Sequence, residues 1–188
     1  MPYSDMLLRP AEPADAIAVA RMHVRSSQVA YRSLMPDDYL DQLRPEDRAA
    51  RYDFTHRDPK LPYTIVAAEG PLIYGLATTM PCRDEDLPDH GELCALYVDP
   101  EYWGRGIGVR LIAAARSHLA RHGFQHASLW LLHGNARAAR FYEIDGWELD
   151  GHQKTDAVWG LTVNEVRYRR ALDAQNPSAR TARLTMDR

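Results

Sequence analysis

Three glycines alternate in the run Trp-Gly-Arg-Gly-Ile-Gly-Val, which spans residues 103–109. An alternating apolar run at 92–98 precedes it, and a helical pattern of apolar residues starting at Ile107 follows it. Glycine lets the backbone approach a ligand without an intervening Cβ, and a helix N-terminus offers free N–H groups to an anion. The run therefore predicts a phosphate-binding loop in which Arg105 is a bidentate donor. A glycine-rich turn before a helix is the alternative.

The common nucleotide-binding motifs that use similar glycines do not match this loop. The chain contains no Gly-Lys-Ser or Gly-Lys-Thr sequence, which a P-loop needs. Its glycines are spaced GxGxG, whereas the dinucleotide fingerprint is GxGxxG. We therefore expect neither a P-loop kinase nor a dinucleotide-dependent dehydrogenase.

The cysteines and the paired histidines give no metal-site pattern. Cys82 and Cys94 lack metal-ligand spacing, and we expect both to be reduced thiols, with Cys94 a small buried residue of its strand. His118 and His122 stand four residues apart, but neither a third ligand nor the glutamate of HExxH accompanies them. We therefore expect no metal in this protein.

The composition is that of an ordinary globular domain. The chain has 188 residues and a formal net charge of −3, which argues against a nucleic-acid partner. It has no apolar run of about 18 residues and no evident signal peptide, so we expect a cytoplasmic protein that does not enter a membrane. We assign residues 1–172 to one domain and residues 173–188, which are polar, to a flexible tail.

The elements that must position the loop follow from hydrophobic periodicity and turn residues. We expect an α/β (α+β) fold, with some parallel pairing where strands and helices alternate. The predicted strands cover 7–9, 63–69, 72–80, 92–98, 127–132, 147–152 and 161–169. The predicted helices start at 13, 36 and 45 and cover 106–122 and 135–146. The acidic stretch 82–90 is expected to be a solvated loop.

Three segments occur together in a specific order. They are Leu8–Ala11 with Pro13–Asp15, the run from Gly91 to Gly108, and Asn135–Glu143 followed by Gly146 and Trp147. Together they resemble the GNAT superfamily of N-acetyltransferases, over about residues 7 to 172. The resemblance implies a central mixed, mostly antiparallel twisted sheet of about seven strands, flanked by about four helices. A splayed pair of strands in that fold holds acetyl-CoA.

The resemblance also implies which residues bind acetyl-CoA, through the strand backbone, the glycine loop and the second segment. They are Leu96, Tyr97, Val98, Trp103, Gly104, Arg105, Gly106, Ile107, Gly108, Val109, Asn135 and Ala138. The family usually has Gln or Arg where this chain has Trp103. This chain is therefore expected to lack one polar contact to the cofactor near the entry of the loop. For Asn135, a plain helix N-cap is the alternative role.

Two residues are the candidates for acid–base chemistry. A free alkylamine has a pKa of ~10 and must lose a proton before it attacks, so the resemblance suggests Glu92 as a base that acts through water. Strict alternation would put Glu92 on the same strand face as Cys94, Leu96 and Val98. Tyr142 is the candidate acid for the leaving thiolate. The alternatives are a surface glutamate and a core aromatic, and Phe141 fits the core role better.

The resemblance implies an acetyl-CoA-dependent N-acetyltransferase in which a primary amine attacks directly in a ternary complex. A small-molecule amine is the first candidate acceptor, and a peptide or protein amine is the second. A non-catalytic module that senses acetyl-CoA is a further alternative, and members of the family are often homodimers. The candidate acceptor residues are Tyr31, Arg32, Asp37, Asp38, Tyr39, the acidic 84–89 loop and Trp159.

Overall fold

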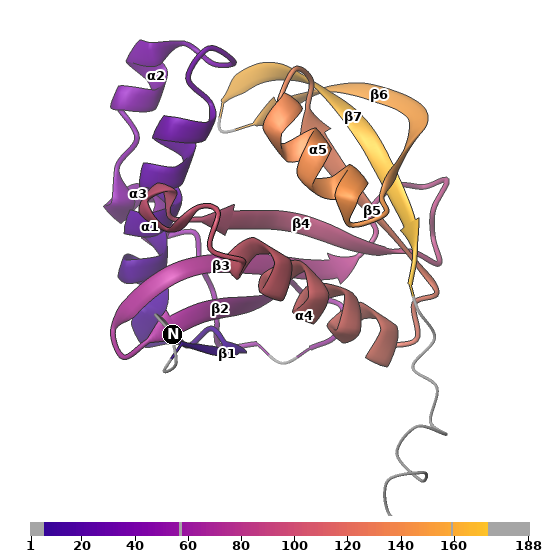
Figure 1. Ribbon diagram of the computed structural model, residues 1–188, viewed down its shortest axis with the longest axis horizontal. Coiled ribbons are helices and arrows are strands. Elements are labelled where there is room, and N and C mark those ends of the chain that lie inside the picture. Colours follow the sequence, from indigo (N-terminus) through magenta and orange to yellow (C-terminus); the bar gives the residue numbers. More distant parts are fainter. Residues whose placement is uncertain (1–5, 57, 159, 173–188) are drawn as a thin grey trace, which may run out of the picture.

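The computed structural model describes residues 6–56, 58–158 and 160–172, which form one seven-stranded sheet with helices on both faces (Figure 1). The strands are β1 (Leu7–Pro10), β2 (Tyr63–Glu69), β3 (Leu72–Pro81), β4 (Gly91–Val98), β5 (His126–Leu132), β6 (Glu148–Val158) and β7 (Leu161–Ala171). Their order across the sheet is β1-β2-β3-β4-β5-β7-β6. Only the β4–β5 pair is parallel, so the prediction of a mixed, mostly antiparallel sheet is confirmed.

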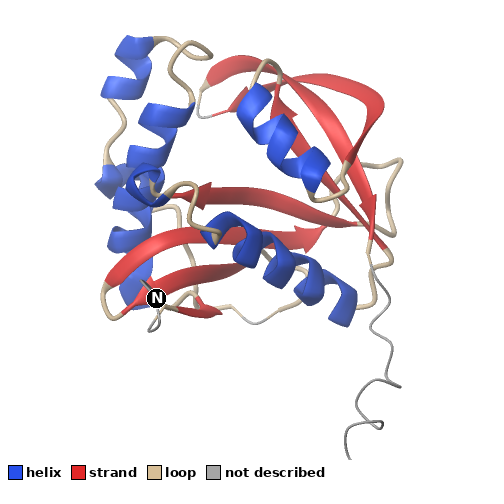
Figure 2. Ribbon diagram, in the orientation of Figure 1, coloured by secondary structure: helices blue, strands red, loops and turns tan. Residues whose placement is uncertain are grey.

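Helices cover both faces of the sheet (Figure 2). They are α1 (Ala16–Ala30), α2 (Asp37–Asp41), α3 (Pro45–Ala49), α4 (Ile107–Arg121) and α5 (Ala136–Ile144), with short 3-10 turns at Pro13–Asp15 and Pro100–Tyr102. Leu111 of α4 packs in the same core cluster as Ile65, whereas Val19 of α1 packs with Val66. Neighbouring residues of β2 therefore face opposite helices, which explains why most of this strand is buried.

Strands β4 and β5 separate almost as soon as they meet. Their parallel pairing is limited to Gly91 with Ala127 and Glu92 with Ser128. Beyond Glu92 the two strands diverge, and β4 continues toward the turn that precedes α4 (Figure 1). Most of β4 therefore has an edge without a strand partner, as the resemblance led us to expect.

A bulge in β4 changes which side chains share a face. The β3–β4 register shifts between Thr78, which pairs with Ala95, and Thr79, which pairs with Leu93. Cys94 is the extra residue. Leu93 and Val98 consequently both face the α4 core. Alternation from Leu93 puts Glu92 on the opposite face, so the prediction that Glu92 shares a face with Leu96 and Val98 is wrong.

The other predicted elements are close to those observed, apart from their lengths. The predicted strand 147–152 is too short, because β6 extends to Val158 as the partner of β7. Helices α2 and α3 end at Asp41 and Ala49, whereas the helical patterns that start at 36 and 45 extend through Leu43 and to about Tyr52. None of the described helices is long and apolar enough to cross a membrane. Trp159 and the tail 173–188 lie outside the described residues.

Candidate active site

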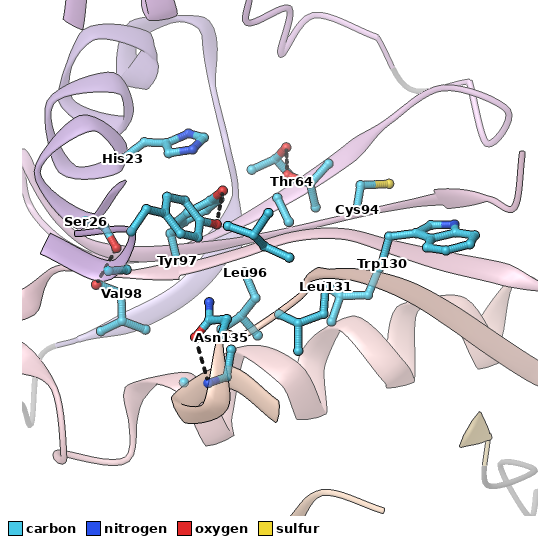
Figure 3. Close-up of a pocket in the computed structure, with 18 of the residues that line it drawn as sticks. His23, Ser26, Thr64, Cys94, Leu96, Tyr97, Val98, Trp130, Leu131 and Asn135 are labelled. Atoms are coloured by element: carbon cyan, nitrogen blue, oxygen red, sulfur yellow. Dashed lines mark hydrogen bonds between the residues drawn. The ribbon is translucent and has the colours of Figure 1, made fainter. Parts of the chain in front are cut away.

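A cavity of about 1340 Å³ follows the free edge of β4 (Figure 3). Its walls come from α1, α3, the glycine loop, the start of α5 and the β6–β7 hairpin. Most predicted site residues line it: Glu92, Leu96, Tyr97, Val98, Trp103, Gly104, Gly106, Ile107, Gly108, Val109, Asn135, Ala138 and Tyr142. Arg105 does not line it, and its guanidinium carbon lies 5.2 Å from the centre of the Tyr102 ring.

The glycine loop has backbone angles that favour glycine. Gly104 and Gly106 have φ values of 74° and 79°, and a Cβ at either position would meet no atom within 4 Å. Gly106 is the N-cap of α4, so the amides of Ile107, Gly108 and Val109 have no partner inside the helix. The loop thus offers open space beside amides that can donate to an anion.

Trp103 holds the entry of this loop against β4. Its indole N–H donates to the carbonyl oxygen of Val98 over 2.7 Å, and the Ser26 hydroxyl donates to the same oxygen over 3.1 Å. The guanidinium carbon of Arg137 lies 3.2 Å from the centre of the indole ring. The position where the family usually has a polar residue therefore carries an aromatic platform that supports an arginine.

Alternate peptide groups of β4 point away from β3. The Asp99 N–H donates to the Tyr74 carbonyl of β3 over 2.8 Å. In an antiparallel pair every second residue bonds the same neighbour, so the backbone N–H and C=O of Tyr97 also face β3. A Cβ on Gly75 would lie 2.6 Å from the Tyr97 carbonyl oxygen, which confirms this direction. The peptide groups of Leu96 and Val98 therefore face the side that β5 has left. The expectation of a free Tyr97 backbone is wrong, and its side chain lines the cavity instead.

The fork is the gap between β4 and β5 after they separate. Asn135 and Ala138, which follow β5 in the chain, line the cavity across the fork from β4. The Asn135 carboxamide oxygen accepts the Ala138 N–H over 3.2 Å and caps α5 (Figure 3). The alternative role of Asn135 as the N-cap of α5 is therefore confirmed. Because the cap uses only the oxygen, the amide NH₂ group of Asn135 remains a possible donor to a ligand in the cavity.

Tyr142 is a buried phenol at the cavity wall. Its ring packs edge-on against Phe141 at 5.4 Å and Trp147 at 6.2 Å between ring centres. Within the described part of the chain, no group forms a hydrogen bond with its hydroxyl. Burial raises the pKa of Tyr142 above its ordinary value, so the phenol keeps its proton at neutral pH.

Glu92 lies where β4 and β5 begin to separate, and it is only 3% exposed. Arg83, in the loop after β3, donates from Nη2 to Glu92 Oε1 over 2.6 Å and from Nε to Oε2 over 3.2 Å. The side chain of Cys94 opens onto the same cavity, so the prediction that it is a buried strand residue is wrong. Desolvation by the surrounding protein atoms nevertheless raises the pKa of the Cys94 thiol.

An aromatic group forms the wall on the α1 side. The His23 ring lies 3.9 Å from the Tyr97 ring, and its Nδ1 is 2.5 Å from the Tyr52 hydroxyl. The hydroxyls of Tyr97 and Tyr31 are 3.0 Å apart (Figure 3). Burial lowers the pKa of His23 to about 3, so this ring is neutral at physiological pH.

A buried arginine organises the wall next to the β6–β7 hairpin. Arg167, 1% exposed, donates to Asp84, Asp86 and Asp150 at 2.6 to 3.0 Å. The Trp130 indole also donates to Asp84, over 3.0 Å. The acidic loop is thus partly bound to the sheet, and the prediction of a simply solvated loop is wrong.

The predicted acceptor residues separate into two groups. Tyr31 lines the cavity, whereas Arg32 lies outside it in ion pairs with Asp37 and Asp41. Asp37, Asp38, Tyr39 and the acidic 84–89 loop do not line the cavity either, and Trp159 lies outside the described residues. Sequence reasoning missed several lining residues: His23, Ser26, Arg48, Tyr52, Arg83, Arg137, Lys154 and Glu165. Of these, only Arg137 stands inside a segment that the resemblance had marked.

His118 lies on α4 and His122 directly follows this helix, and neither residue lines the cavity. The His118 ring stacks on Tyr63 at 4.0 Å, and its Nδ1 is 3.0 Å from the Thr79 hydroxyl. Burial lowers the pKa of His118 to about 4. Among the described residues, no group of three His, Cys, Asp or Glu side chains is placed to hold a metal ion.

Comparisons with known proteins agree with this architecture. Residues 28–147 match the Acetyltransferase (GNAT) family. An uncharacterized N-acetyltransferase of Bacillus subtilis, YuaI, is 30% identical over 129 residues, which are 68% of this chain and 72% of that protein. The mycothiol acetyltransferase of Acidimicrobium ferrooxidans is 28% identical over 81% of this chain, but the match covers only 46% of that protein.

A solved structure shows the same fold. The structure of yncA from Salmonella typhimurium with its cofactor acetyl-CoA aligns with a TM-score of 0.66, at 18% identity, over 92% of this chain and 97% of that one. The fold, the family match and the Bacillus relative lead to one conclusion: the chain belongs to the GNAT family and is an acetyltransferase.

Proposed function

We propose that this acetyltransferase takes the acetyl group from acetyl-CoA and transfers it to the primary amine of a small molecule, by direct attack in a ternary complex. The observation that carries the proposal is the free edge of β4. The peptide groups of Leu96 and Val98 face the fork, the glycine loop follows directly, and Tyr142 lines the same cavity. One continuous cavity thus offers backbone donors and acceptors, amides for phosphates and a phenol.

The loop amides and the strand edge would orient the donor. The glycine loop fits a pyrophosphate because Gly104 and Gly106 leave open space beside the first amides of α4. A free peptide N–H on the β4 edge would stabilise the oxyanion that forms on the thioester carbonyl. These roles need no side chain, so they tolerate Trp103 at the entry of the loop.

The proton transfers fall to Glu92 and Tyr142. The acceptor's ammonium group first passes a proton to Glu92 through water, and the neutral nitrogen then attacks the thioester carbon. The nitrogen loses its second proton to water as the amide forms. The carbon–sulfur bond then breaks, and Tyr142 donates its proton to the sulfur. The burial that raises the pKa of Tyr142 also raises that of a thiol beside it, so the transfer is not opposed by burial itself.

A small-molecule acceptor is favoured over a peptide by the similarity to a mycothiol acetyltransferase. The cavity is also lined on several sides, by α1, α3 and the β6–β7 hairpin. A peptide amine is the second candidate. A sensing module without activity is disfavoured because Glu92 and Tyr142 both line the cavity.

The test begins with thermal unfolding in the presence of acetyl-CoA, CoA, ATP or NAD. A ligand at about 100 times its Kd stabilises by about 2.7 kcal/mol, which should raise the Tm by about 5–10 °C. We expect a rise with acetyl-CoA and CoA alone. A panel of small amines and short peptides is then screened by thiol release, and intersecting initial-velocity lines would indicate a ternary complex. Equal shifts with all four ligands, or no shift, would refute the assignment of the donor.

A further inference from the structure

Glu92 and Arg83 form an ion pair whose two members are buried very differently. The Glu92 carboxylate is almost fully enclosed, whereas the Arg83 side chain is 64% exposed. Two guanidinium nitrogens contact the two carboxylate oxygens, and the Arg83 backbone N–H lies 3.4 Å from Oε2. The carboxylate is therefore fixed, while the cation reaches it from the solvent side.

The position of the pair is as important as its geometry. Glu92 and Arg83 both line the cavity, next to the point where β4 and β5 separate. The neighbouring Asp84 is held by Arg167 and Trp130, so the backbone near Arg83 is anchored. Its long side chain can move without the loop moving, because its head is solvated and its stem carries rotatable bonds.

A buried carboxylate that loses its partner is costly unless another cation replaces it. Arg83 already supplies three donors to a carboxylate that has about four lone-pair sites, so an incoming ammonium group meets a largely occupied acceptor. Lys154 is another cation that lines this cavity, but it contacts Glu165 at 3.5 Å and Asp156 at 3.0 Å. Lys154 is therefore already shared between two other carboxylates.

We infer that Arg83 is an internal stand-in for the acceptor's cationic group: its guanidinium covers Glu92 until the acceptor's ammonium group displaces it. Glu92 is then both the docking site for the acceptor as a cation and, after displacement, the group that takes up its proton. The acceptor class is thus an amine that is protonated at neutral pH. The identity of the displacing cation as the acceptor rests on the proposed function, whereas the cation site itself does not.

The test uses small cations as probes and needs neither the acceptor nor acetyl-CoA. R83A opens the site, R83A/E92Q removes its charge, and R32A is the matched control because Arg32 pairs with exposed carboxylates outside the cavity. Thermal unfolding is followed in methylguanidinium or methylammonium chloride, against sodium chloride at the same concentration. Of the three variants, only R83A should have a higher Tm in the organic cation than in sodium chloride, by about 3–5 °C at about ten times the Kd of the cation.

Each result decides the inference. If R83A does not fold in sodium chloride, folding restored by methylguanidinium or methylammonium supports the site. Failure of both cations to restore folding contradicts it. If R83A folds but responds no more than R32A or R83A/E92Q, Arg83 is a structural partner only. A response to methylguanidinium without one to methylammonium would overturn the ammonium assignment. A positive result remains valid even if acetyl-CoA fails to bind, so the two proposals fail separately.

Discussion

The indole nitrogen of Trp103 lies 2.7 Å from the carbonyl oxygen of Val98, and the hydrogen bond between them ties the glycine loop to the end of β4. Val98 O also accepts the Ser26 hydroxyl, so this carbonyl is occupied before any ligand arrives. The adjacent Arg137 guanidinium packs on the indole face and lines the cavity. At the position where the family usually has a polar side chain, Trp103 therefore fixes the loop and holds an arginine.

Substituting Trp103 should separate these two effects. W103F loses the hydrogen bond to Val98 but keeps a ring beneath Arg137, so we expect a stability loss of about 1 kcal/mol and little change in acetyl-CoA affinity. W103A loses the ring as well and should weaken acetyl-CoA binding by about tenfold. Urea unfolding and isothermal titration calorimetry measure the two quantities. Equal affinity losses in both variants would mean that the ring does not support Arg137.

Y142F should affect turnover far more than binding or stability. The Tyr142 hydroxyl forms no hydrogen bond with the described residues, so its removal leaves no protein group unpaired. Loss of a general acid typically lowers the rate by about 10²-fold or more. We expect that fall in kcat, with the Kd of acetyl-CoA within about twofold of wild type. The matched variant F141L tests a neighbouring core ring and should lower the Tm with a smaller effect on kcat.

Turnover of Y142F equal to that of wild type would remove Tyr142 from its proposed role. A variant with lower affinity for acetyl-CoA and unchanged kcat would instead make Tyr142 a binding residue. Single-turnover measurements with saturating acceptor distinguish these outcomes, because they separate the chemical step from binding.

The parts of the fold that local patterns control were predictable from the sequence. The glycine loop, the N-cap at Asn135 and the succession of strands and helices along the chain each depend on short-range signals, and the structure has all of them. The face on which Glu92 lies was not predictable, because the bulge at Cys94 depends on the register with β3. One extra residue reverses the alternation on which the prediction relied.

The cavity walls were predictable only in part, because they combine elements distant in sequence. His23 lies on α1 and Tyr52 follows α3, and the two meet where the His23 ring packs against Tyr97 of β4. The acidic loop was expected to be solvated because Arg167 stands 81 to 83 residues away from its partners there. No local pattern reports such a pairing.

His23 should make the protein less stable in acid. Burial lowers its pKa to about 3, below the ordinary value of 6.5, so its contribution is fully present above pH 6.5 and is lost as the pH falls toward 3. Between pH 7.5 and 4.5 protonation of this residue alone should cost roughly 3 kcal/mol of unfolding free energy. H23Q removes the titrating ring, and urea unfolding at both pH values should show a correspondingly smaller loss. The same loss in H23Q and wild type would contradict a buried neutral His23.

Replacing Arg167 should strongly destabilise the protein and free the acidic loop. R167M keeps an apolar stem but leaves Asp84 and Asp150 without their partner, and breaking such a buried pair typically costs about 3–5 kcal/mol. The control is R169M, because the Arg169 side chain is 43% exposed and only approaches Asp150, at 4.0 Å. Urea unfolding should separate the two variants by at least about 2 kcal/mol. Similar stabilities would mean that solvent satisfies the carboxylates, and that the wall beside Trp130 does not depend on Arg167.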